Sequence, residues 1–155
     1  MKKILIILIL FLFCKKIYSQ QNETQSEEFN RLINYIPSTL KNEKYVSDLE
    51  KKYRIKLNNL NTLFNLAQSK EKLKFTKKDI SIFEKQIKDL AIAFNKDEKL
   101  FILKGYMSHG CNPISSDNIN GKQIKTILWC YGSIVENDKP ILNFFRIFNN
   151  QVKQL

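Results

Sequence analysis

Apolar residues recur every three or four positions between residues 46 and 94, and this helical period constrains the fold more than any other feature of the chain. Two successive runs carry it, so we predict two helices of about 20 and about 18 residues. Their similar lengths and the short linker between them predict an antiparallel helical hairpin. The first run is Val46, Leu49, Tyr53, Leu57, Leu60, Phe64 and Ala67, and the second is Ile80, Phe83, Ile87, Leu90 and Phe94.

Capping residues mark where these helices should begin. Ser47 with Glu50, and Thr76 with Asp79, have the spacing of a capping box, in which each side chain bonds a free backbone N–H of the first turn. A shorter amphipathic helix is predicted before them, from Ser26 to a stop at Pro37. Its apolar side consists of Phe29, Leu32, Ile33 and Ile36.

After residue 98 the sequence changes to short runs of β-branched and aromatic residues separated by turn formers. We predict strands over 100–107, 122–135 and 141–148, with a bulge at Gly132. Between the first two strands we expect a loop at 110–117 and a tight turn at Asn120-Gly121, and between the last two a hairpin loop at 136–140. Helices followed by strands indicate an α+β fold with a helical hairpin and a short helix packed on a three-stranded antiparallel sheet.

The chain has 155 residues, of which 43% are hydrophobic. This is enough for one packed domain and too little for two, so we expect a single α+β domain over 29–155, with a helical part over 29–98 and a sheet part over 99–155. The last two predicted strands are apolar on both sides. The sheet should therefore be covered on both faces or leave an apolar groove.

The first 19 residues have the layout of a bacterial secretory signal peptide. Lys2 and Lys3 precede an unbroken apolar run from 4 to 13, which at ~1.5 Å per residue is too short for a stable membrane span. We place the cleavage between Ser19 and Gln20, followed by a flexible leader over 20–28. The expected location is therefore secreted or periplasmic. A lipid anchor on Cys14 is the alternative, but the bulky Phe13 before it does not suit that processing.

Export leaves Cys111 and Cys130 in an oxidising compartment, where a disulfide between them is the tentative expectation. A rival interpretation is a secreted thiol enzyme or hydrolase that uses His109 and Cys111. The only histidine of the chain is His109, and no phosphate-binding loop or serine nucleophile motif occurs. We therefore lean towards a protein that is not an enzyme, with no catalytic, metal or cofactor site.

Basic residues dominate the charge. The net charge of +11 falls to +7 without the four lysines of the signal peptide. Arginine, the favoured reader of phosphates and bases, occurs only three times, so nucleic acid is not an expected partner. The densest cluster could instead contact an anionic polymer or lipid surface. That cluster is Lys70, Lys72, Lys74, Lys77 and Lys78.

These features together predict a small exported bacterial protein that is a non-catalytic binding domain of the envelope or secretome. It should bind a protein partner through the sheet hairpin or the basic helical face, and no stable membrane span should remain after cleavage. The sequence leaves the identity of that partner and the oligomeric state open.

Overall fold

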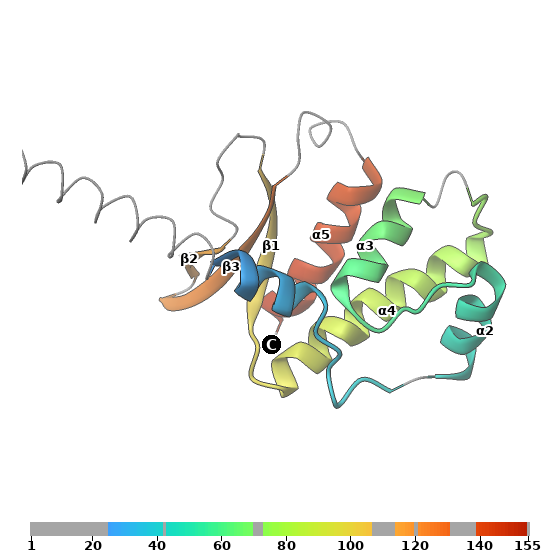
Figure 1. Ribbon diagram of the computed structural model, residues 1–155, viewed down its shortest axis with the longest axis horizontal. Helices are drawn as coiled ribbons and strands as arrows, with labels where there is room; N and C mark the ends of the chain where they lie inside the picture. Colours follow the sequence, from blue (N-terminus) through green and yellow to red (C-terminus); the bar gives the residue numbers. More distant parts are fainter. Residues whose placement is uncertain are drawn as a thin grey trace, which may run out of the picture.

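The computed structural model describes residues 25–41, 43–69, 73–106, 114–119, 121–130 and 139–154. Within them the chain has an α+β fold with five helices and one three-stranded sheet. The sheet lies at one end of the molecule and α2 (Lys44–Tyr53) lies at the other (Figure 1). The predicted signal peptide, most of the predicted leader and residues 131–138, with the predicted bulge at Gly132, lie outside the described residues.

The helix predicted after Thr76 is confirmed as α4 (Lys77–Lys96), together with its capping box. The Asp79 backbone N–H donates to Thr76 Oγ1 over 3.2 Å, and the Thr76 N–H donates to Asp79 Oδ2 over 2.9 Å. The apolar run that the period identified faces the core. Its buried members are Phe83, Ile87, Leu90 and Phe94.

The single long helix predicted over 46–67 is wrong, because two helices stand in its place. α2 ends at Tyr53; its C-cap, Arg54, takes the left-handed conformation with φ 55°, and α3 (Leu60–Ser69) begins six residues after Arg54. Asn59 caps α3, since its Oδ1 accepts a hydrogen bond from the Thr62 N–H over 2.9 Å. Two short helices joined by a buried Leu57 satisfy the same apolar spacing as one long helix, which explains the error.

The capping box predicted at Ser47 and Glu50 is also wrong. α2 begins three residues earlier, at Lys44, so both residues lie inside the helix. Glu50 is buried and its carboxylate binds the backbone of the connection between α2 and α3 instead.

The sheet is mixed, not antiparallel as predicted. Its strands are β1 (Phe101–Tyr106), β2 (Ile114–Ile119) and β3 (Lys122–Cys130), in the order β1-β3-β2. β3 runs parallel to β1 and antiparallel to β2. The predicted loop at 110–117 is wrong at its end, where Ser115, Ser116 and Asp117 belong to β2. The turn before β3 is borne out by Gly121, whose φ of 77° suits a residue without a Cβ.

The third predicted strand, 141–148, is wrong: these residues belong to α5 (Lys139–Lys153). Their apolar positions fit a helical period, and a strand would have left both of its sides apolar. The reason for expecting an apolar groove beside that strand therefore no longer applies. The buried residues of α5 are Ile141, Phe144, Phe145, Phe148 and Val152.

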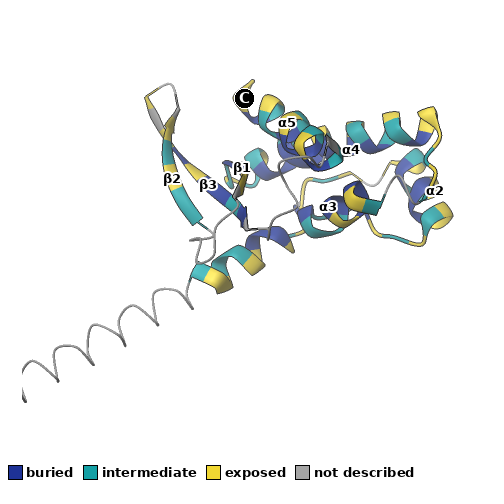
Figure 2. Cartoon of the chain, turned by 90° about the horizontal axis from the view of Figure 1, so that it is seen from above, coloured by how far each residue is buried: buried dark blue, intermediate teal, exposed yellow. Residues whose placement is uncertain are grey.

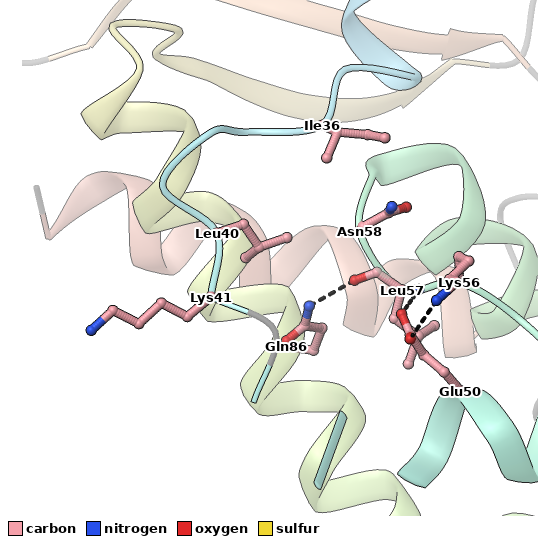
Figure 3. A pocket seen from close by; sticks show the side chains of 8 residues that line it. All are labelled: Ile36, Leu40, Lys41, Glu50, Lys56, Leu57, Asn58 and Gln86. Atoms are coloured by element: carbon pink, nitrogen blue, oxygen red, sulfur yellow. Dashed lines mark hydrogen bonds and ion pairs between the residues drawn. The ribbon is translucent and has the colours of Figure 1, made fainter. Parts of the chain in front are cut away.

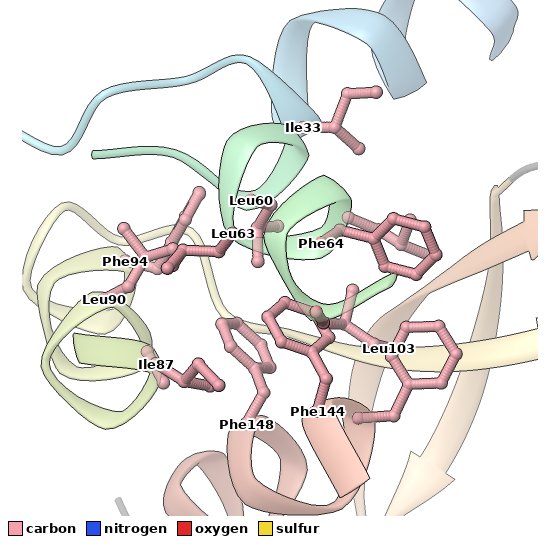
Figure 4. Packing of buried hydrophobic residues seen from close by; sticks show 14 of the residues in the cluster. Ile33, Leu60, Leu63, Phe64, Ile87, Leu90, Phe94, Leu103, Phe144 and Phe148 are labelled. Carbon is pink, nitrogen blue, oxygen red and sulfur yellow. The ribbon is translucent and has the colours of Figure 1, made fainter. Parts of the chain in front are cut away.

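The core lies where α3, α4 and α5 meet and where they cover one face of the sheet (Figures 2 and 4). Trp129 of β3 stacks on Phe64 of α3 with ring centroids 4.3 Å apart, and Phe29 from the helix at 25–33 packs against its edge at 5.6 Å. Asn149 of α5 binds both backbone groups of Leu103, donating to its O over 2.7 Å and accepting from its N over 2.8 Å. Residues from both halves of the chain thus share one core.

Candidate functional site

The first wall of the candidate site is residues 35–41, which we call the strap; it contains a turn at 38–39 and runs from the helix at 25–33 towards α2 (Figure 1). Asp97, at the end of α4, holds the strap in place. Its carboxylate accepts hydrogen bonds from the Tyr35 hydroxyl over 2.7 Å and from the Ser38 N–H over 2.8 Å, and also from the Ser38 and Thr39 hydroxyls. The bond from Tyr35, followed by that from Ser38, keeps the pKa of Asp97 below its usual value.

The second wall is the connection between α2 and α3, where Leu57 is held by both of its backbone groups. Its N–H donates to Glu50 Oε1 over 2.7 Å, and its carbonyl oxygen accepts from Gln86 Nε2 over 2.6 Å. Both partner side chains are buried, with Gln86 only 2% exposed. One residue of the connection is thereby fastened to α2 and to α4.

These elements enclose a pocket of about 180 Å³, which we call the Gln86 pocket. Leu40, Gln86, Leu57 and Glu50 are grouped around it in Figure 3, while the Lys41 side chain extends away from the others. Ile36, at its edge, is 56% exposed. The pocket is lined by Ile36, Leu40, Lys41, Glu50, Lys56, Leu57, Asn58 and Gln86.

Gln86, which lines this pocket, has a side-chain acceptor without a partner among the described residues. The Leu57 carbonyl can only accept a hydrogen bond, so the Gln86 atom that faces it must be the NH₂ group, and the other end of the amide is Oε1. This buried oxygen has no hydrogen-bond partner within the part of the chain that the structure describes. Buried polar atoms without a partner are rare because each costs about 1–3 kcal/mol. A residue that lines the pocket thus carries a buried acceptor without a partner in the described part of the chain.

An ion pair separates the Gln86 pocket from a second, shallower depression. Lys56 Nζ lies 3.3 Å from Glu50 Oε2, and the Lys56 side chain is 72% exposed. Both residues line the two depressions. The second, which we call the basic hollow, has a volume of about 390 Å³ and is lined by Ser47, Glu50, Lys51, Arg54, Ile55 and Lys56.

This arrangement is suited to binding. The residues that line the Gln86 pocket provide amides, one carboxylate, two ammonium groups and aliphatic surface, with no paired nucleophile and base among them. Among the described residues, no group of three or more histidine, cysteine or acidic side chains could hold a metal ion.

The residues singled out by sequence lie elsewhere. Ser19, Gln20, Lys70, Lys72, His109 and Cys111 are outside the described residues, and Cys130 is the last residue of β3. Lys74, Lys77 and Lys78 are exposed around the start of α4 and are not part of either depression. The predicted disulfide and the thiol site thus each include a residue that the structure does not describe.

Sequence reasoning missed Gln86 and assigned Glu50 a capping role. A signal for Gln86 was present, because it stands three residues after Phe83 and four before Leu90, on the apolar side of α4. A polar residue in such a run needs a buried partner or a functional explanation. Glu50 likewise stands four residues after Val46 and three before Tyr53 in an apolar run, but which backbone group it binds depends on where α2 ends.

The chain matches no family model, and neither a curated protein nor a solved structure resembles it significantly. In the portion of the chain that the structure describes, every helix is too short or too polar to cross a bilayer.

Proposed function

We propose that this chain is a small exported protein that acts by binding and not by catalysis, and that the Gln86 pocket is its binding site. Export is supported by the basic and apolar layout of residues 1–19. The observation that carries the binding site is the buried Gln86 Oε1, which lacks a partner among the described residues and belongs to a lining residue of the pocket.

The energetic argument is direct. The unpaired oxygen costs the free protein about 1–3 kcal/mol, and a ligand that donates a hydrogen bond to it recovers that free energy on binding. The aliphatic side chains of Leu40 and Leu57 add contacts that favour the apolar part of a ligand. A ligand with one donor and a small aliphatic body therefore fits the pocket.

Binding is tested by titrating the purified protein with small amines, alcohols and amides, while the Gln86 side-chain amide and the Leu57 backbone amide are followed by NMR. We expect at least one of these probes to shift both signals in a saturable way. Gln86→Met should abolish the Leu57 response, whereas Gln68→Met, at an exposed position of α3, should leave it intact. If no probe shifts either signal, the Gln86 pocket is not a binding site.

Export is tested separately by mass spectrometry of the protein recovered from the cells that produce it. The proposal expects a mature form beginning at Gln20 in the envelope or culture medium. A full-length form that retains Met1 and remains in the cell interior would refute it.

Three lysines support a second candidate function, which is binding to an anionic surface. Lys74, Lys77 and Lys78 are exposed and form no ion pair with a described acidic residue. They surround the N-terminal end of α4, where the helix dipole is already positive, so they do not stabilise the helix. Vesicles containing anionic phospholipid should bind the protein, and Lys77→Gln with Lys78→Gln should weaken that binding more than Lys88→Gln with Lys96→Gln. Equal effects of the two pairs would dismiss the cluster.

A further inference from the structure

We propose that the ligand of the Gln86 pocket is a small aliphatic zwitterion, of the class of free α-amino acids, which inserts between Lys56 and Glu50. Its ammonium group faces Gln86 Oε1 and Glu50, and its carboxylate faces Lys56. This inference rests on the proposed function, because it names the chemistry of the ligand that the pocket binds.

The part of the pocket near Gln86 and Glu50, which we call its inner end, favours a cationic hydrogen-bond donor. Two of its lining residues carry oxygen acceptors: Gln86, whose buried Oε1 has no partner among the described residues, and Glu50 with its carboxylate. Glu50 is buried and accepts one bond from the Leu57 N–H, and a buried carboxylate is stabilised by a cation beside it. An ammonium group provides three donors and a positive charge, which serves both acceptors.

The existing ion pair can open to admit such a ligand. The Lys56 side chain is 72% exposed and its Nζ lies 3.3 Å from Glu50 Oε2, which describes a solvated and weakly held pair. When the ligand ammonium replaces Lys56 at Glu50, the released Lys56 can pair with the ligand carboxylate. Every charge then retains a partner of opposite sign, so insertion leaves no buried charge uncompensated.

The basic hollow sets the orientation of the ligand. Lys51, Arg54 and Lys56 line it against the single acid Glu50, so its outer side favours a carboxylate. A zwitterion therefore fits with its ammonium group towards the acceptors on the inner side and its carboxylate towards the cations on the outer side. The reverse orientation would place like charges together.

The aliphatic lining selects the rest of the ligand. Leu40 and Leu57 line the Gln86 pocket, and Ile36 stands at its edge with 56% of its surface exposed. Ile36 and Leu142 are the exposed large apolar residues within the described ranges, so an apolar ligand body over Ile36 would cover unusual surface. A short branched side chain meets this requirement.

Three probes of similar shape test the ligand class in titration calorimetry with the purified protein. L-Valine carries both charged groups, isobutylamine lacks the carboxylate, and isovalerate lacks the ammonium group. We expect L-valine to bind about tenfold or more tightly than either of the others. Equal binding of isobutylamine, or tighter binding of isovalerate, would overturn the zwitterion while leaving the pocket as a binding site. If none of the three binds but other donors give a response in the NMR titration, the zwitterion is also overturned and the pocket remains a binding site.

Two variants test the insertion. Lys56→Met retains the length of the exposed side chain and removes the competitor for Glu50 for both amines, so it should lower the ratio of L-valine affinity to isobutylamine affinity about tenfold. Glu50→Gln should weaken both amines. Lys88→Met, at an exposed position of α4 away from the pocket, is the control and should change neither. If Lys56→Met leaves the ratio of L-valine affinity to isobutylamine affinity unchanged, the ligand carboxylate does not pair with Lys56 and the inference fails, even if Glu50→Gln proves too unstable to measure.

Discussion

Replacing Gln86 by methionine should change the stability of the protein far less than its burial suggests. The residue is 2% exposed, and its Nε2 donates to the Leu57 carbonyl over 2.6 Å. Losing that bond leaves a buried carbonyl unsatisfied, at a cost of about 1–3 kcal/mol. Methionine also removes Oε1, the acceptor that has no partner among the described residues, and this recovers about 1–3 kcal/mol.

These two contributions are of similar size and opposite sign. Methionine has nearly the same length as glutamine and suits an irregular apolar site, so little packing is lost. The free energy of unfolding of Gln86→Met should therefore lie within about 1 kcal/mol of the original value, although the substitution breaks a buried hydrogen bond. Urea denaturation of the ligand-free protein measures it, with the slope m compared to confirm that the same surface unfolds.

Gln68→Met, on the exposed side of α3, is the control for replacing glutamine by methionine. Its free energy of unfolding should stay within about 0.5 kcal/mol of the original value. A loss of more than about 2 kcal/mol in Gln86→Met, at an unchanged m, would refute the reasoning. It would mean that Gln86 Oε1 has a hydrogen-bond partner in the free protein. The Gln86 pocket would then lack the unsatisfied acceptor on which its assignment as a binding site rests.

Three further substitutions test the contacts that hold the fold and the strap. Asp79→Ala should destabilise the protein by about 2–3 kcal/mol at pH 7, since Asp79 accepts from Lys52, Tyr53 and Thr76. Burial raises the pKa of Asp79, but these bonds outweigh it and hold the pKa well below its usual value. The difference in unfolding free energy between the two proteins should therefore shrink as the pH falls below about 4, where the Asp79 carboxyl begins to protonate in the unfolded chain. Asn149→Ala should lower the unfolding free energy by about 2 kcal/mol, whereas Asn150→Ala, at an exposed neighbouring position, should not. Asp97→Ala should speed tryptic cleavage after Lys41, as the strap loses its main anchor, and equal cleavage rates would show that the strap is held by other contacts.

Part of this fold could be predicted from the sequence because it depends on local patterns. α4 has a capping box, an uninterrupted apolar period and no competing signal, and it formed where expected. β1 follows from its run of apolar residues, and Gly121 follows from turn chemistry. These signals operate over a few residues and need no knowledge of the rest of the chain.

The errors occurred where one pattern fitted two structures. The residues from Ile141 to Phe148 are apolar at alternating positions as well as at a helical spacing, and in the structure the helical spacing buries one side of α5 against α3 and α4. The predicted long helix is interrupted at Arg54, which takes a left-handed conformation. Arginine has no particular preference for that conformation, so the sequence does not predict the break. The candidate site depends on these tertiary features, because Glu50 and Gln86 meet only at the connection that Arg54 begins.

The walls of the Gln86 pocket come from three stretches of chain that are far apart in sequence: the strap, the connection between α2 and α3, and the middle of α4. A molecule that touches all three would link them and resist their separation, in addition to the hydrogen bonds and buried apolar contacts that already join them. Occupancy should therefore slow the exchange of backbone amide hydrogens with heavy water in the strap and around Leu57, and leave exchange in the β2–β3 hairpin unchanged.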